Sequence, residues 1–248
     1  MASKNRPLKK GGSFKNFFMF NPSILFEDNH LLVVEKPVNL PAQEDTSGDP
    51  DILSLLKDWI KQRDQKPGNV FLGLVHRLDR PAGGAMVFAK TSKAASRLAQ
   101  QMQDRTFEKT YLSVVRGQPK SGTGRLVHWL LKDERTNTVF VVPEGTSEAK
   151  RAVLDYACVE MKEGLGLLRI GLETGRSHQI RVQLASMNCP IYGDQKYGSD
   201  VNKPGEQLAL WATEICFEHP VKKERLTFTS QPPDEYPWSL FEKIYSER

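Results

Sequence analysis

The sequence centres on Val75-His76-Arg77-Leu78-Asp79-Arg80-Pro81-Ala82-Gly83-Gly84, a polar connection between two apolar runs. The runs at 70–75 and 85–90 have the short apolar pattern of buried strands, so the polar stretch should join two packed elements. Pro81 fixes one backbone dihedral angle, whereas Gly83 and Gly84 allow positive φ or close approach by another backbone or a ligand. Asp79 lies between two arginines, whose positive charge favours its ionised form. The residues alone leave open a structural ion pair or an active site.

Three further stretches complete a set of four motifs. They are Leu25-Phe26-Glu27-Asp28-Asn29-His30-Leu31-Leu32-Val33-Val34-Glu35-Lys36-Pro37, Phe107-Glu108-Lys109-Thr110-Tyr111 and Leu172-Glu173-Thr174-Gly175-Arg176-Ser177-His178-Gln179-Ile180-Arg181. Together with His76-Arg77-Leu78-Asp79, and in this order, they resemble the motifs of the RluA-type pseudouridine synthases. The resemblance covers about residues 24–230. The chain departs from many members in reading Arg-Pro-Ala-Gly-Gly after Asp79, where they have Thr-Ser-Gly, and in lacking room before residue 24 for their small RNA-binding domain.

The resemblance implies an RNA pseudouridine synthase, an isomerase that acts on specific uridines of rRNA or tRNA. It implies that Asp79 is the catalytic residue, that Tyr111 lies in the active site, and that Arg176 pairs with Asp79 and holds it. It implies neither a metal nor another cofactor, and the sequence contains no nucleotide-binding motif. The remaining expected contacts, to phosphates or to the space that the base vacates, are Arg77, Arg80 and Lys109.

Two rival functions belong to other classes. A catalytically silent RNA-binding or ribosome-assembly module could have the same fold, and its mark would be loss of the aspartate or its partners. Asp79, Tyr111 and Arg176 are all present. A hydrolase or deaminase that acts on bases would need metal ligands, but the five histidines and three cysteines stand at unsuitable spacings.

Composition is consistent with a cytoplasmic protein that binds RNA. The 248 residues carry 35 Lys and Arg against 30 Asp and Glu, and a formal charge of +5 suits a polyanionic partner without requiring one. Cys158, Cys189 and Cys216 are far apart, which favours buried thiols in a reducing compartment. No apolar run approaches the ~20 residues of a membrane span, so we expect no membrane association. We expect a monomer.

The pattern of elements predicts an α+β fold. Strand candidates alternate with only three or four helices and show no regular βαβ rhythm, so the sheet should be largely antiparallel or mixed. The resemblance implies that this sheet is long and bent, with the catalytic cleft across its middle. We expect a flexible basic tail over residues 1–23 and a single catalytic domain over 24–248. The stretch 118–150 suggests an excursion that carries a hairpin.

Helix ends and strand faces can also be predicted. Asp49, Ser92 and Ser177 are candidate N-caps of three helices, because a short polar side chain precedes an apolar stripe in each case. Phe107 to Gly117 has the pattern of a strand, on which Lys109 and Tyr111 share one face.

Overall fold

The computed structural model describes residues 20–244, which form one sheet, three α-helices and two short 3-10 turns. The strands are β1 Ser23–Glu27, β2 Leu31–Lys36, β3 Gly73–Leu74, β4 Gly83–Ala89, β5 Glu108–Arg116, β6 Thr123–Asp133, β7 Thr138–Val142, β8 Lys150–Lys162, β9 Leu165–Leu172, β10 Leu210–Glu218 and β11 Arg225–Thr229. The helices are α1 Ile52–Arg63, α2 Ser92–Gln103 and α3 Gln179–Ser186, and the 3-10 turns are η2 Trp238–Leu240 and η3 Glu242–Ile244. Most of the expected basic tail, residues 1–19, lies outside the described residues.

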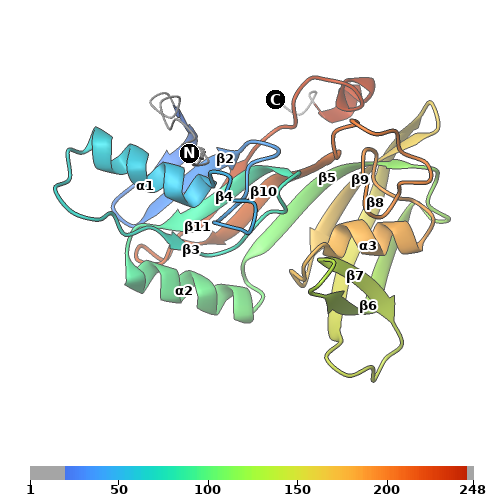
Figure 1. Ribbon diagram of the computed structural model, residues 1–248, viewed down its shortest axis with the longest axis horizontal. Coiled ribbons are helices and arrows are strands. Elements are labelled where there is room, and N and C mark those ends of the chain that lie inside the picture. Colours follow the sequence, from blue (N-terminus) through green and yellow to red (C-terminus); the bar gives the residue numbers. More distant parts are fainter. Residues whose placement is uncertain (1–19, 245–248) are drawn as a thin grey trace, which may run out of the picture.

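The sheet has eleven strands among the described residues, and its main path runs β1-β2-β4-β10-β5-β9-β8-β6-β7. β3 pairs with β4 at one side of this path, and β11 pairs with β10. Every pairing is antiparallel except that of β4 with β10. The predicted α+β class with a mixed, mostly antiparallel sheet is therefore confirmed. Figure 1 shows how this sheet bends across the whole molecule.

The parallel pairing of β4 with β10 joins the two halves of the sheet. It consists of two residue pairs, Trp211 with Gly83 and Ala212 with Gly84. A Cβ atom on Gly83 would overlap the indole ring of Trp211, and one on Gly84 would overlap the Ala212 carbonyl. Gly84 also has a φ of 117°, which disfavours L side chains. The close approach expected of these two glycines is therefore an approach to another strand.

Helices α1 and α2 cover opposite faces of the first half (Figure 1). Because strand side chains alternate, Leu32 and Val34 of β2 belong to the core that includes α1. Leu31 and Val33 belong instead to the core that includes α2. All four side chains are fully buried, which explains why β2 reads as an uninterrupted apolar run.

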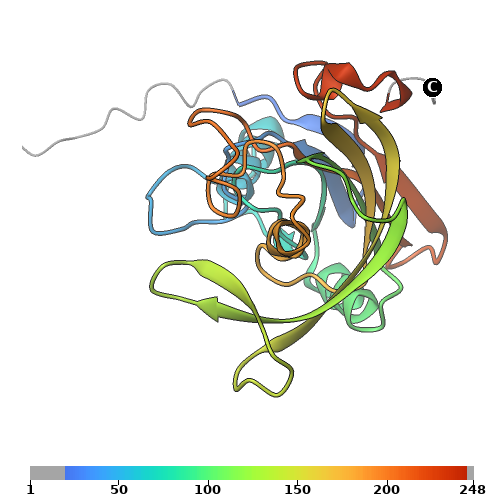
Figure 2. The same cartoon turned by 90° about the vertical axis from the view of Figure 1, so that its right-hand side faces the viewer.

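Helix α3 lies inside the curl of the second half, as Figure 2 shows end-on. Its apolar residues point in two directions: Ile180 and Leu184 enter the large central core, whereas Val182 packs with a small cluster formed mainly by β6, β7 and β8. The residues of that cluster on these strands are Leu130, Val139 and Ala152. The excursion predicted from residue 118 is the long hairpin β6–β7, which closes one end of the sheet.

The predicted helix caps are wrong in register. Asp51, rather than Asp49, caps α1 by accepting from the Ser54 amide at 3.0 Å. Thr91, rather than Ser92, caps α2 by accepting from the Ala94 amide at 3.2 Å. Short polar residues cluster before both helices, and sequence cannot say which one keeps the extended backbone that a cap needs.

Helix α3 begins without a side-chain cap. His178, rather than Ser177, is its N-cap residue, and it adopts a left-handed backbone with φ of 50° and ψ of 19°.

No helix within residues 20–244 is long and apolar enough to cross a bilayer.

We predict that Gly83→Ala destabilises the fold, because the added methyl group must displace the buried Trp211 ring at the only pairing between β4 and β10. Overpacking of this kind costs about 1–3 kcal/mol of unfolding free energy. Gly122→Ala is the control, since a Cβ there meets no atom within 4 Å. Urea unfolding of both variants measures the difference, and equal stability would contradict a tight junction.

Candidate active site

A cleft of about 1830 Å³ lies where the two halves of the sheet meet. Three of the four motifs line it, through residues 74–82, 107–111 and 171–181. Small-molecule pockets usually measure about 300–1,000 Å³, so this cleft is large enough for a segment of a polymer. It crosses the middle of the sheet, as predicted.

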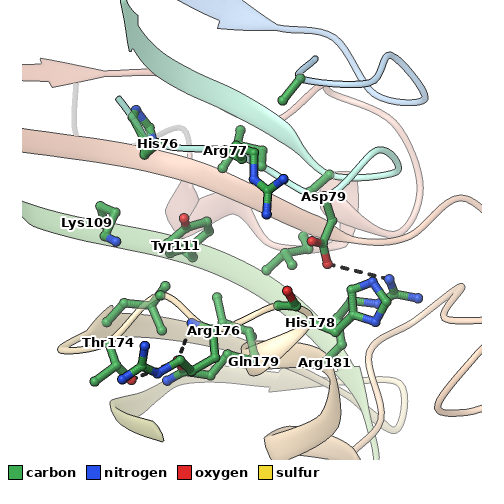
Figure 3. Close-up of a pocket in the computed structure, with 18 of the residues that line it drawn as sticks. His76, Arg77, Asp79, Lys109, Tyr111, Thr174, Arg176, His178, Gln179 and Arg181 are labelled. Atoms are coloured by element: carbon green, nitrogen blue, oxygen red, sulfur yellow. Dashed lines mark hydrogen bonds and ion pairs between the residues drawn. The ribbon is translucent and has the colours of Figure 1, made fainter. Parts of the chain in front are cut away.

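Asp79 lies in the connection from β3 to β4, where its carbonyl accepts from the Ala82 amide at 3.0 Å. Its side chain is 27% exposed and faces the cleft, at 3.5 Å from Nη1 of Arg181. Figure 3 shows this ion pair across the cleft. The carboxylate is therefore accessible to a substrate while one cation holds it.

Lys36, at the end of β2, holds the segment that connects β3 to β4 and carries Asp79. Its side chain is fully buried, and its ammonium donates to the carbonyls of Pro37, Leu40 and Arg80 at 2.8, 2.6 and 3.2 Å. Burial lowers the pKa of Lys36 to about 7, while the negative charge of Asp79 acts in the opposite direction. Lys36 thus fixes the backbone immediately after Asp79.

Arg181 is shared between two carboxylates. Its Nε and Nη2 donate to both oxygens of Asp194 at 2.8 Å, which leaves Nη1 for Asp79. Asp194 is fully buried in its side chain and also accepts from the amides of Lys196 and Tyr197. Burial is the largest single influence and raises the pKa of Asp194, but the hydrogen bonds and charge of Arg181 and the amides of Lys196 and Tyr197 together outweigh it and lower the pKa. A planar guanidinium held at two points in this way has little freedom to turn.

The predicted pair between Arg176 and Asp79 is wrong. Arg176 precedes α3, is exposed, and donates from Nε to the Arg151 carbonyl at 3.1 Å. Figure 3 shows its side chain pointing away from Asp79. Instead, His178, the N-cap of α3, and Arg181, in the first turn of that helix, both line the cleft near Asp79. The available signal in the sequence was that Arg181 belongs to the same motif, five residues after Arg176.

Tyr111 and Lys109 line the cleft from β5, as expected. Tyr111 is 6% exposed. Burial raises its pKa and the negative charge of Asp79 acts in the same direction, so the hydroxyl stays protonated at neutral pH. Burial lowers the pKa of Lys109. The structure therefore brings Tyr111 to the neighbourhood of Asp79, where it presents a neutral aromatic surface.

The two arginines that flank Asp79 in sequence have different surroundings. Arg80 turns outward, where it pairs with Asp49 and donates to the Ser47 hydroxyl at 3.1 Å. Arg77 lines the cleft, is exposed, and has no ion pair among residues 20–244. Arg77 is therefore the more available of the two for an anion in the cleft.

His178 and Asp194 are site residues that the sequence prediction missed. The His178 ring lines the cleft beside Arg181 (Figure 3). Its Nδ1 lies 2.7 Å from the hydroxyl of Tyr197. No group of three or more His, Cys, Asp or Glu side chains within the described part of the chain could hold a metal ion.

Comparison with known proteins agrees with this arrangement. The model of a family described as RNA pseudouridylate synthase matches residues 30–186, more than half of the chain. The chain belongs to the RNA pseudouridine synthase family. The family predicted from the four motifs is thus confirmed, and nothing in the comparisons favours a silent RNA-binding module.

Relatives resemble the chain over most of its length. An uncharacterized RNA pseudouridine synthase of Aquifex aeolicus is 34% identical over 90% of this chain and 72% of its own. The ribosomal large subunit pseudouridine synthase D of Nitrosomonas europaea is 34% identical over 86% and 62%. The solved structure of human RNA pseudouridylate synthase domain containing 4 superposes with a TM-score of 0.71 at 25% identity, covering 85% of this chain and 88% of that one. The chain spans 62 to 72% of the length of the curated relatives that it matches.

We predict that Arg181→Lys lowers the reaction rate, whereas Arg176→Lys changes at most the affinity for RNA. A lysine at 181 keeps the charge but lacks the fork that Asp194 holds, so the cation moves relative to Asp79, and a displacement of about 1 Å can cost roughly 10²-fold in rate. Arg176 makes no contact with either carboxylate, so the same substitution there should change RNA affinity at most. Single-turnover rates and filter-binding affinities separate the two, and an equal loss of rate at both positions would contradict this assignment.

Proposed function

We propose that this chain converts specific uridines of RNA to pseudouridine, with Asp79 as the essential carboxylate. The observation that carries the proposal is the Asp79 side chain, accessible in a large cleft, held by Arg181 and accompanied by Tyr111. An exposed structural ion pair would not need a buried second carboxylate, Asp194, to fix its cation.

The reaction requires no net gain or loss of atoms. The bond from the ribose C1′ to N1 of uracil breaks, the base turns, and C1′ bonds to C5; the proton leaves C5 and N1 gains one. One carboxylate suffices as nucleophile or general base, acting on the sugar or on the base. Arg181 orients that carboxylate, and the neutral aromatic ring of Tyr111 supports the base by stacking.

The target nucleotide must leave its stack to reach Asp79, because chemistry on a base inside a helix is sterically blocked. Positively charged side chains along the cleft support binding of the RNA backbone on either side of the target nucleotide. Arg77, Lys109 and Arg176 line the cleft and have no carboxylate partner among residues 20–244. The neighbouring Arg105, in contrast, is paired with Glu173. Phosphate contacts by the first three would make affinity depend on salt.

We further propose that the substrate is rRNA or tRNA, that the protein acts in the cytoplasm as a monomer, and that it needs neither a metal nor another cofactor. Relatives described as ribosomal large subunit pseudouridine synthase D make large-subunit rRNA the first RNA to test. The residues 24–248 are proposed to act as one catalytic domain, with specificity coming from the cleft and its rim.

We predict that Asp79→Asn removes pseudouridine formation, because an amide serves neither as nucleophile nor as base. The rate should fall by at least about 10²-fold, with melting temperature and RNA affinity largely retained. The assay is pseudouridine mapping in unmodified transcripts of large-subunit rRNA and of tRNA. Asp58→Asn, at an exposed position of α1, is the matched control. A variant at position 79 with a tenth of the wild-type rate would exclude Asp79 as essential.

We predict that the target uridine lies in a loop, bulge or other unpaired site. Extracting a base from a stack costs a few kcal/mol, and least where pairing is already absent. A synthetic stem-loop that carries the mapped uridine should therefore react nearly as fast as the full transcript, and a fully paired version should react much more slowly. Equal rates on the duplex, or no reaction on the stem-loop, would mean that the enzyme reads a larger tertiary shape.

A further inference from the structure

His178 is held in an unusual way at the edge of the cleft. It is the N-cap of α3 in a left-handed conformation, which is uncommon for residues other than Gly, although Asn, Asp and His adopt it more often than most. The cost of such a conformation must be offset by surrounding contacts. The conformation places the imidazole in the cleft beside Asp79 and Arg181 (Figure 3).

The hydrogen bonds around Tyr197 determine which nitrogen of His178 carries the proton. The Val139 amide of β7 donates to the Tyr197 hydroxyl oxygen at 2.8 Å. That hydroxyl lies 2.7 Å from Nδ1 of His178. All protons find acceptors only if the amide donates to the hydroxyl and the hydroxyl donates to Nδ1, so Nδ1 is the acceptor and Nε2 carries the hydrogen.

The other nitrogen of His178 is unused. Nε2 has no hydrogen-bond partner among residues 20–244, although His178 lines the same cleft as Asp79. The groups whose charges act on the ring are Asp79, Arg181, Lys196 and Asp194. Burial lowers the pKa of His178, ahead of the opposing effect of Asp79, so the imidazole stays neutral at physiological pH.

We propose that His178 is a substrate-positioning residue: its Nε2–H, fixed by the chain Val139 to Tyr197 to His178, donates a hydrogen bond to an oxygen of the nucleotide that lies against Asp79. The acceptor is a ribose hydroxyl or a carbonyl of the uracil. This inference rests on the proposed function. It also couples the β6–β7 hairpin to the reacting nucleotide, because Val139 belongs to that hairpin.

Lys196, the neighbour of Tyr197 in the chain, holds the β6–β7 hairpin at a second point. Lys196 donates to the carbonyls of Thr136 and Asn137 at 3.2 and 3.1 Å, and these residues form the turn between β6 and β7. Since Asn137 and Lys196 both line the cleft, the hairpin turn is part of the rim and its position is fixed together with that of His178. A change in the hairpin should therefore alter how the target nucleotide is oriented.

The first test needs no RNA. Nitrogen chemical shifts of His178 in the purified protein should report the neutral Nε2–H tautomer between pH 6 and 8. Tyr197→Phe removes the donor to Nδ1, so both tautomers should appear and the midpoint of protonation should rise. Tyr192→Phe is the matched control, because the Tyr192 hydroxyl bonds to Glu206 and its ring lies under Arg116, outside the cleft. A wild-type Nδ1–H tautomer would overturn the proposal.

The second test measures the contact itself. His178→Phe keeps a planar ring but removes the donor, and single-turnover conversion of the stem-loop should slow by about tenfold, the scale of one hydrogen bond. His178→Gln restores an N–H donor and should recover part of the rate. The stem-loop is then made with one oxygen of the target replaced, as 2′-deoxyuridine, 2-thiouridine or 4-thiouridine. The loss caused by His178→Phe should shrink on the one RNA that lacks the acceptor.

The outcomes are distinct. Equal rates for the wild type and His178→Phe, or a loss that stays the same on all three substituted RNAs, would overturn the proposal, because His178 would then act only through the fold. A wild-type protein that modifies no RNA would instead contradict the proposed function. The tautomer measurement would still decide whether the donor at position 178 is fixed.

Discussion

The parallel contact between β4 and β10 is the constraint on which the rest of the structure depends. Only two residue pairs make it, at Gly83 and Gly84, yet it joins the half of the sheet covered by α1 and α2 to the half that curls around α3. A side chain at either glycine would push the strands apart. Because the Asp79 connection leads directly into Gly83, the geometry of this junction also sets where the carboxylate stands relative to β5 and α3.

The charged residues at the site form one connected network, because Arg181 contacts both carboxylates, Asp79 and Asp194. Arg181 is bound by Asp194 inside the protein and reaches Asp79 with its remaining nitrogen. A buried guanidinium without Asp194 would be costly, and a buried Asp194 without Arg181 equally so, since an unpaired buried charge destabilises a fold by several kcal/mol. The partner of Asp79 is therefore held in place whether or not a substrate is present, and its orientation is fixed in advance of binding.

Residues 191–198 hold three of the site residues in position through hydrogen bonds, although none of the four motifs includes them. Asp194 holds Arg181, Tyr197 holds His178, and Lys196 holds the turn of the β6–β7 hairpin. One loop thus links the cation beside Asp79, the histidine at the entry of α3 and the rim of the cleft. Its polar residues resemble those of an ordinary turn, because their role depends on partners that are distant in sequence.

The sequence by itself determined the family, the α+β class and the placement of Asp79 and Tyr111 in one cleft, because these follow from local patterns: apolar runs, strand periodicity and four motifs read in order. It predicted Arg176 as the partner of Asp79, and the structure assigns that contact to Arg181. Only the tertiary structure decided this, along with Asp194, His178 and the helix caps. A cap depends on which residue keeps an extended backbone, and an ion pair depends on the direction in which a helix leaves its loop. Neither is a property of neighbouring residues; both follow from packing between segments far apart in the chain.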